Sequence, residues 1–278
     1  MLYLILAIVS SSMVSIVMRA SKERVKNNIS LLVMNYGVCL VLACAYTGID
    51  KLFQTGSGLR MAYGLGLLNG LFYIGSFVLF QYNVKKNGVV LSAVFMKLGV
   101  LVPTILSITV FQEHPGAKQL IGLIMAIAAI LIVNLEKPKQ REAAFKVGLL
   151  VLLLGNGCAD GMSKVFRELA DPAYEEQFLL ITFIVACTVS VLFMLYKKQR
   201  ITFAEVGYGM LLGIPNYYSA RFLLKALGSI PAFVAYPTFS VATIGVISLA
   251  GIFLFREQFT KKQVSAMCII AVALVLLN

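Results

Sequence analysis

Ten apolar runs of about 17 to 25 residues recur along the chain, and they restrict it to a narrow class of folds. A helix of roughly 20 residues crosses the hydrocarbon core of a bilayer. Because lipid offers no hydrogen bonds to the backbone, long apolar runs span a membrane as helices. The runs cover residues 2–19, 29–47, 61–82, 88–111, 117–134, 147–166, 177–196, 204–226, 231–255 and 262–277. The sequence therefore predicts an all-α integral membrane protein with ten transmembrane helices.

Composition supports this class. Hydrophobic residues make up 60% of the 278 residues and charged residues only 13%, whereas a soluble domain carries about 25% charged residues. The net charge of +12 lies mostly in short loops beside the runs, where Lys and Arg set orientation and meet lipid head groups. We therefore expect the lipid bilayer, and not nucleic acid, as the partner of the basic residues.

Two stretches near the ends of the chain's halves resemble each other. Residues 111–134 and 255–278 align without a gap, and each has an apolar run, a short acidic-then-basic turn, and a second apolar run that ends in Asn. The shared pairs are Phe111/Phe255, Glu113/Glu257, Lys118/Lys262, Gln119/Gln263, Ala129/Ala273 and Asn134/Asn278. Such an echo predicts one membrane unit present twice, which is a common plan of secondary transporters.

The polar segment 136–146 divides the chain after five runs and before five more. Because five is odd, the second set enters the membrane in the opposite orientation, which predicts two inverted repeats. We expect a first five-helix repeat at 1–135, a connecting loop at 136–146 and a second five-helix repeat at 147–278. The odd-numbered loops carry more than twice the Lys and Arg of the even-numbered ones, which by the positive-inside rule places both termini outside.

The motif residues resemble a known family. The segments Pro103–Gln119 and Pro237–Gln263, with Glu113 and Glu257 as turn acids, are similar to the EamA-like transporters of the drug/metabolite transporter superfamily. The resemblance covers essentially the whole chain, although the usual Gly before each turn acid is replaced.

The resemblance implies a carrier that moves a small polar metabolite by alternating access, from a central cavity between the repeats. It also implies that both termini lie in the cytoplasm, whereas the distribution of Lys and Arg in the loops places them outside. Members of the superfamily carry amino acids, nucleotide sugars, sugar phosphates, choline-like amines or cationic drugs. The first run lacks a basic segment before it and a clear cleavage site after it. We expect a retained helix in a bacterial or archaeal cytoplasmic (cell) membrane.

Lys97 is the candidate that the sequence singles out first. It lies nine residues or so into the run 88–111, hence about 14 Å deep at 1.5 Å per residue. A charge at that depth costs about 2.5–3.5 kcal/mol even on the lenient insertion scale, so it needs a partner. Lys97 is either an anion site or gating charge, or one half of a structural ion pair between helices.

Asp160 is the candidate partner. Asn156, Asp160 and Lys164 share one helix face at i, i+4 and i+8. Asp160 can pair locally with Lys164, across to Lys97, or with substrate, and a desolvated carboxylate can also carry a coupled proton. Ser12 occupies the matching position in the first run, so proton coupling through that helix is not expected.

Three further runs carry polar faces at helical spacing. Such faces suit a cavity in which tyrosines stack on a substrate and amides or hydroxyls bind its polar groups. The alternative is that these polar residues hold neighbouring membrane helices together. Arg221 lies near a helix end and can simply snorkel to the interface. The residues are Asn69 and Tyr73, then Asn216, Tyr217 and Arg221, then Tyr236 and Ser240.

Glycines and prolines predict how the helices pack and bend. GxxxG spacing favours close packing, and prolines are expected to interrupt helices. Glu113 and Glu257 are expected to cap or orient the following helix, not to take part in transport. The glycine pairs are Gly66/Gly70 and Gly157/Gly161, and the prolines are Pro103, Pro215 and Pro237.

The sequence favours a transporter over an enzyme. It has one histidine, His114, and five cysteines within apolar runs, without metal-ligand spacing or an ATP motif. We expect no enzyme activity, no cofactor and no metal. The predicted function is secondary transport of an amino acid or another anionic or zwitterionic solute, by a monomer or homodimer, with a coupled proton or counter-substrate. The alternatives are an organic-cation or drug exporter that uses Asp160 and tyrosines, and a channel or structural membrane partner.

Overall fold

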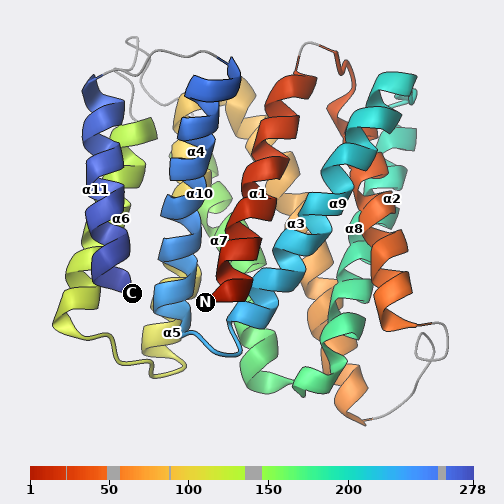
Figure 1. Ribbon diagram of the computed structural model, residues 1–278. Coiled ribbons are helices and arrows are strands. Elements are labelled where there is room, and N and C mark those ends of the chain that lie inside the picture. Colours follow the sequence, from red (N-terminus) through yellow and green to blue (C-terminus); the bar gives the residue numbers. More distant parts are fainter. Residues whose placement is uncertain (23, 49–56, 88, 135–145, 256–260) are drawn as a thin grey trace. The chain divides into compact units, whose positions relative to one another are not determined.

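The structure is a computed structural model that describes residues 1–22, 24–48, 57–87, 89–134, 146–255 and 261–278. Over these residues the chain forms α-helices, one short 3₁₀ turn at Pro172–Tyr174, and no strand (Figure 1). The helices are α1 (Leu2–Ser21), α2 (Asn28–Thr47), α3 (Ser57–Asn87), α4 (Val89–Leu98), α5 (Leu101–Thr109), α6 (Ala117–Asn134), α7 (Lys146–Leu169), α8 (Glu175–Tyr196), α9 (Phe203–Ala226), α10 (Ala232–Phe255) and α11 (Lys261–Leu277). The all-α prediction is confirmed.

Seven helical segments in the described ranges are long and apolar enough to cross a bilayer. The apolar helices α6 and α11 are shorter, and α9 carries the charged residues Glu205, Arg221 and Lys225. Each of the ten apolar runs forms helix, so the chain is a multi-pass membrane protein.

One predicted span is two helices. The run 88–111 breaks between α4 and α5 at Gly99 and Val100. Pro103 lies in the first turn of α5, where its missing N–H leaves no hydrogen bond unmade. An unbroken helix would instead need the Pro103 N–H to reach the Gly99 carbonyl. The break therefore follows from the proline, and it lies two residues after Lys97.

The chain divides into two compact units, each of which contains segments of both predicted repeats. Unit 1 comprises Met1–Ile74 and Val165–Ala226, and unit 2 comprises Gly75–Lys164 and Leu227–Asn278. Helices α3 and α7 contribute residues to both units. The repeat boundaries remain a prediction, and residues 135–145, nearly all of the predicted connecting loop, lie outside the described residues.

In unit 1, α9 packs against α1 and α2, and α2 also packs against α8. Glycines permit these contacts. A Cβ added at Gly213 of α9 would lie 2.5 Å from the Val38 Cβ on α2, and one at Gly70 of α3 would lie 2.6 Å from the Thr182 carbonyl oxygen on α8. The close packing predicted for Gly66/Gly70 is thus confirmed, and Gly209/Gly213 makes the same use of GxxxG spacing.

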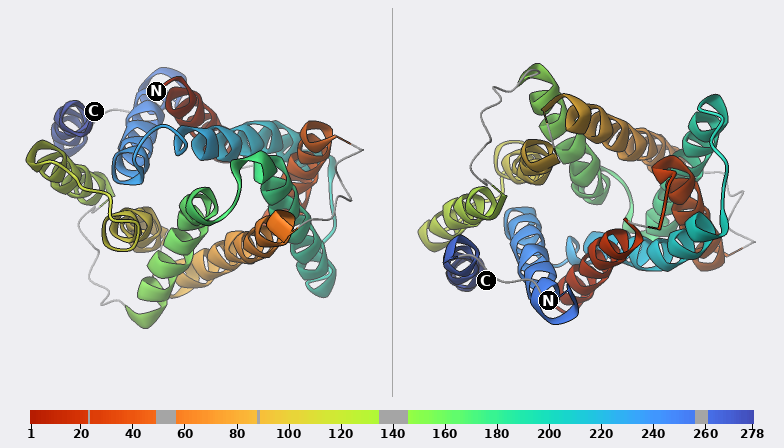
Figure 2. Two further views of the ribbon diagram at one scale, coloured as in Figure 1. Left: turned by 90° about the horizontal axis from the view of Figure 1, so that it is seen from below. Right: turned by 90° about the horizontal axis from the view of Figure 1, so that it is seen from above.

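In unit 2, α6 and α11 lie side by side (Figures 1 and 2), and α10 packs against α5, α6 and α11. Helix α7 approaches the break between α4 and α5 closely. A Cβ added at Gly157 would lie 2.5 Å from the Gly99 carbonyl oxygen. The glycine therefore sets Asn156 and Asp160 of α7 next to the end of α4.

The expectation that prolines interrupt helices is wrong for Pro215 and Pro237. Both lie inside helices that continue past them, Pro215 in α9 and Pro237 in α10. Membrane helices tolerate proline because neighbouring helices and local adjustments satisfy the freed carbonyl.

Candidate functional site

Lys97 and Asp160 meet within unit 2. Lys97 is the second-last residue of α4, Asp160 lies on α7, and the two charges interact electrostatically. Within the described part of the chain, Lys97 forms no direct hydrogen bond with a carboxylate. Two opposite charges inside predicted spans therefore interact electrostatically without forming a hydrogen-bonded pair.

Asn156 and Tyr236 hold Asp160 in place. The Asn156 Nδ2 donates to Asp160 Oδ2 at 3.3 Å and to the Met96 carbonyl at 3.0 Å, which ties α7 to α4. The buried Tyr236 on α10 donates its hydroxyl to the Asp160 backbone carbonyl at 2.7 Å. Ser240 lies one turn further along α10 and is partly exposed. The structure thus brings Lys97, Asn156, Asp160 and Tyr236 together.

Lys164 has a partner that its spacing from Asp160 does not indicate. Its Nζ lies 2.7 Å from Glu113 Oε1, and the ammonium also lies 5.5 Å from the centroid of the Phe111 ring. The two side chains are 6% and 13% exposed, so this ion pair is buried. The acid that Lys164 binds is therefore Glu113, which lies between α5 and α6, and not its neighbour on α7, Asp160.

Glu113 caps α10 and not the helix that follows it. Its carboxylate accepts the N–H of Ala232 at 2.9 Å and that of Phe233 at 3.1 Å, the first two residues of α10. The expectation that Glu113 caps the helix that follows it is therefore wrong, because Glu113 caps α10. The following helix, α6, has its own cap, because Gln119 Oε1 accepts the Gly116 N–H at 2.9 Å. Glu257 lies outside the described residues.

The environment of Glu113 favours its ionised form. Burial alone would raise the pKa of this carboxyl group, but the Lys164 ammonium and the N–H groups of Ala232 and Phe233 outweigh it. The pKa of Glu113 therefore lies below its ordinary value. The charged carboxylate is the form that holds α7, the 111–116 segment and α10 together.

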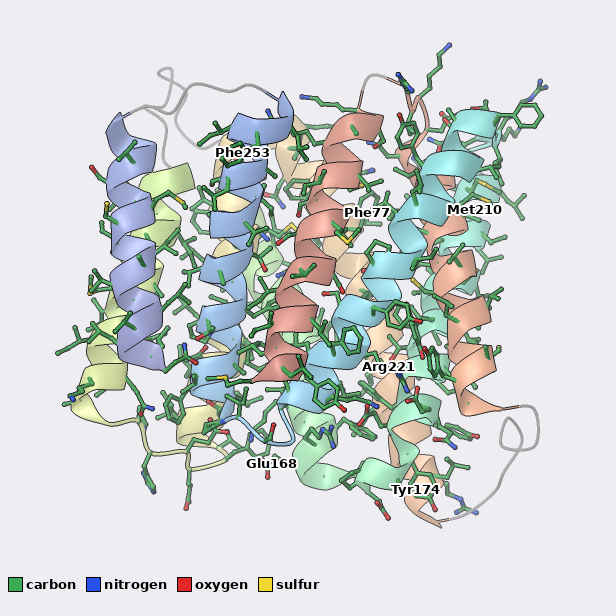
Figure 3. All side chains as sticks on the ribbon, in the orientation of Figure 1. Phe77, Glu168, Tyr174, Met210, Arg221 and Phe253 are labelled. Atoms are coloured by element: carbon green, nitrogen blue, oxygen red, sulfur yellow. The ribbon has the colours of Figure 1, made fainter. Side chains whose placement is uncertain are left out.

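In unit 1, Arg221 of α9 binds Glu176 in the first turn of α8. The Arg221 Nη2 and Nε donate to Glu176 Oε1 at 2.5 and 2.9 Å, and the Tyr217 hydroxyl donates to Glu176 Oε2 at 3.3 Å. Figure 3 shows Arg221 near the end of α9 that leads to α10. Arg221 is therefore an ion-pair partner within the protein, and snorkelling does not account for its position.

The remaining candidates bind neighbouring helices in unit 1. Asn69 Nδ2 donates to Thr182 Oγ1 at 3.3 Å, while the buried Asn69 Oδ1 has no hydrogen-bond partner among the described residues. Tyr73 packs edge-on against Phe183, with ring centroids 6.3 Å apart. Asn216 Nδ2 donates to Asn35 Oδ1 at 3.3 Å. These contacts fit the interpretation that polar residues hold helices together.

The ten candidate residues are shared between the two units. Lys97, Asn156, Asp160, Tyr236 and Ser240 belong to unit 2. Asn69, Tyr73, Asn216, Tyr217 and Arg221 belong to unit 1. The described residues contain no group of three or more His, Cys, Asp or Glu placed to hold a metal ion.

Sequence reasoning missed Glu176 and Tyr46. Glu176 directly precedes the run 177–196, and its position at a helix N-terminus, where carboxylates are favoured, was the available signal. Tyr46 ends a run that showed no polar face, yet Arg221 Cζ lies 3.8 Å from the centroid of its ring. Only the packing of α2 against α9 brings it there.

Comparisons with known proteins agree with this architecture. A protein of Haemophilus influenzae, itself described as uncharacterized, is 29% identical over 203 residues, which are 69% of this chain and 67% of the relative. A solved structure, titled only as the crystal structure of a protein, is 14% identical with a TM-score of 0.75 and covers 99% of this chain and 94% of that one. At that identity the match shows the fold alone.

The family match lies at the N-terminal side. Residues 1–135 match the EamA-like transporter family, and these are the residues of the first predicted repeat. Members of this family are transporters, which supports the assignment of this chain to transport and not to enzymes. Over these residues the chain is similar to the EamA-like transporter family, which is part of the drug/metabolite transporter superfamily.

Proposed function

We propose that this protein is a secondary active transporter of a small zwitterionic or anionic solute, of the amino-acid type, which works by alternating access in the cell membrane. One observation carries the substrate class: Asn156 joins the Asp160 carboxylate of α7 to the Met96 carbonyl next to Lys97 on α4, and the two charges interact without a direct hydrogen bond. A zwitterion has a carboxylate for the Lys97 ammonium and an ammonium for the Asp160 carboxylate.

The energetics favour a functional role for this pair. Each charge inside a span is costly, and the cost falls only when a partner neutralises it. A hydrogen-bonded ion pair would neutralise both charges by itself. Two charges that are not hydrogen-bonded to each other leave donors and acceptors for a ligand. Asn156 and Tyr236 hold the Asp160 segment in one position, which lowers the cost of ordering this side of the site when a ligand binds.

The helix break next to Lys97 supplies a means of movement. Lys97 lies two residues before Gly99 and Val100, where the hydrogen-bond ladder between α4 and α5 is interrupted. Binding-dependent rotation about such a break changes the position of the ammonium without unfolding a helix. Broken helices at substrate sites are a recurring device of transporters. A coupled proton or an exchanged counter-substrate would drive the cycle.

The second candidate function is export of an organic cation through Asp160. The observation in its favour is the position of Tyr236, which is held beside Asp160 by its hydrogen bond to the Asp160 carbonyl. A carboxylate next to an aromatic ring suits an amine through charge and cation–π contact. In this case Lys97 would lower affinity for the substrate and its removal would raise it.

A thermal-shift screen of the purified protein in detergent tests the proposal. Ligands that bind the folded state raise the apparent Tm by mass action. We expect zwitterions or anions to stabilise the wild type and to lose this effect with Lys97→Ala. Lys22→Ala, which removes an exposed cation at the end of α1, serves as control and should behave as wild type. Stabilisation by amines alone, unaffected or strengthened by Lys97→Ala, would favour the cation exporter.

A further inference from the structure

Glu176 and Arg221 form a carboxylate–guanidinium contact with fork geometry in unit 1. Two guanidinium nitrogens of Arg221 donate to the Glu176 carboxylate, with the closer nitrogen, Nη2, at 2.5 Å. The Tyr217 hydroxyl is a third donor to the same carboxylate, at 3.3 Å. An arginine fork with a neighbouring hydroxyl is a preferred arrangement for recognising planar carboxylates.

Tyrosine rings surround this contact. The Arg221 guanidinium lies 3.8 Å from the centroid of the Tyr46 ring, a cation–π distance. Tyr46 in turn stacks on Tyr217 with ring centroids 5.7 Å apart, and the hydroxyls of Tyr46 and Tyr218 are 2.8 Å apart. The rings hold the guanidinium plane in one orientation, so its donors point toward the carboxylate.

Two other ion pairs among the described residues, Lys164–Glu113 and Arg167–Glu175, also bind backbone groups. Glu113 accepts two N–H groups at the start of α10. Arg167 donates to Glu175 at 2.9 Å and also to the Leu224 carbonyl at 2.8 Å. The side chains of Arg221 and Glu176, in contrast, hydrogen-bond only to side chains among the described residues. Their separation would therefore leave the helix termini intact.

The pair of Arg221 and Glu176 is less enclosed than that of Lys164 and Glu113. The Arg221 and Glu176 side chains are 14% and 22% exposed, and Tyr46 is 42% exposed. A ligand could therefore reach the guanidinium from the side of Tyr46. The buried pair of Lys164 and Glu113, at 6% and 13%, is more enclosed.

From these observations we infer that Arg221, Tyr217 and Tyr46 form a second binding site, for carboxylates with an aromatic or flat apolar group, and that Glu176 occupies it from within the chain. An incoming carboxylate takes the place of the Glu176 carboxylate on the Arg221 fork, and its ring packs against Tyr46. The inference deepens the proposed function, and rests on it, because it supplies a place where the carboxylate of a transported solute is bound apart from Lys97.

Glu176→Gln tests the inference, because it removes the competing charge and keeps the side-chain shape. The probe is benzoate, with uncharged benzamide as its neutral analogue, and binding is measured by calorimetry on purified protein in detergent. A charge-assisted hydrogen bond is worth about 1.5–3 kcal/mol, and about 1.4 kcal/mol corresponds to a factor of ten. We therefore expect benzoate to bind Glu176→Gln about tenfold or more tightly than wild type, and benzamide to show no such gain.

Two controls isolate the site. Glu175→Gln removes the same charge from the adjacent residue but leaves Arg221 bound to Glu176, so its benzoate affinity should stay within about twofold of wild type, a change near 0.4 kcal/mol. Adding Arg221→Lys to Glu176→Gln keeps the positive charge, removes the fork and should abolish the gain. An equal gain in Glu175→Gln, or a gain that survives Arg221→Lys, would show general electrostatic attraction and overturn the inference.

A second variant guards against loss of folding. If Glu176→Gln does not purify as a folded protein, Glu176→Asp shortens the competing side chain by one methylene and should also strengthen benzoate binding. Equal affinities of wild type and the folded variants overturn the inference. The assay involves no transport, and Lys97 is the same in Glu176→Gln and in the double variant with Arg221→Lys, so the difference between these two variants reports on the Arg221 site alone. Failure of the proposed transport function would instead appear as absence of flux.

Discussion

The Lys164 ammonium lies 2.7 Å from the Glu113 carboxylate, and the same carboxylate accepts the first two N–H groups of α10. One turn earlier on α7, the Asp160 carbonyl accepts the hydroxyl of Tyr236 on α10. Two successive turns of α7 are therefore linked to α10, one directly and one through Glu113. These links fix the helix that carries Asp160.

Removal of Lys164 should destabilise the protein. Breaking a buried ion pair by removing one partner costs about 3–5 kcal/mol, because the other charge remains in a poorly solvated place. Lys164→Met should therefore lower the resistance of the protein to denaturation in mixed detergent micelles. Lys118→Met, which removes an exposed cation at the start of α6, should leave it unchanged. Equal stability of Lys164→Met and Lys118→Met would contradict this role of the pair.

The contribution of Glu113 should vanish in acid. Its pKa is lower in the folded protein than the ordinary value of about 4.3, so the unfolded chain takes up the proton first as the pH falls. The stabilisation is present above the ordinary value and is lost as the pH falls through the folded pKa. The difference in Tm between wild type and Glu113→Gln should be constant near neutral pH and shrink below about pH 4. A difference that grows in acid would refute this assignment.

Gly213 and Gly207 offer a matched test of helix packing on α9. A Cβ at Gly213 would lie 2.5 Å from the Val38 Cβ, whereas one at Gly207 meets nothing within 4 Å. Gly213→Ala should therefore separate α9 from α2 and cost about 1–3 kcal/mol. Gly207→Ala should be neutral or stabilise by about 0.4–1 kcal/mol, because alanine restricts the unfolded chain. Equal effects of the two substitutions, measured by denaturation in mixed micelles, would argue against the close approach.

Helix positions followed well from the sequence because apolar runs in lipid have one main structural outcome. The run 29–47, for example, forms α2 at Asn28–Thr47. The division of 88–111 into α4 and α5 was not predicted, although Pro103 was noted as a point of interruption. Pro103 lies in the first turn of α5, so the break lies before the proline, at Gly99 and Val100.

The partners of charged residues were harder to predict, because spacing along one helix reveals only local neighbours. Lys164 shares a face with Asp160 but reaches Glu113, which the N-terminus of α10 holds in place. Arg221 likewise pairs with Glu176, on a helix whose packing the sequence does not specify. For Asp160 the sequence left Lys164, Lys97 and substrate open as partners, and the structure shows an electrostatic interaction with Lys97.

Tyr236→Phe should weaken the hold on the Asp160 backbone while it leaves the charge of the Asp160 carboxylate unchanged. Loss of the hydroxyl leaves the Asp160 carbonyl without its 2.7 Å donor, at a cost of about 1 kcal/mol. We expect a raised KM for the transported solute with little change in maximal rate, because the carboxylate remains but is held less firmly. Tyr196→Phe, at a tyrosine that is 78% exposed, is the control. An unchanged KM in Tyr236→Phe would remove Tyr236 from the site.

Counterflow in proteoliposomes tests the central claim most directly. Vesicles loaded with unlabelled amino acid should take up the labelled compound transiently against its gradient, as a carrier requires and a channel does not allow. Lys97→Ala and Asp160→Asn should each reduce this uptake about tenfold or more, the loss expected for one charge-assisted contact. Lys22→Ala should retain it. Full counterflow in both Lys97→Ala and Asp160→Asn would contradict the assignment of these two residues to the substrate.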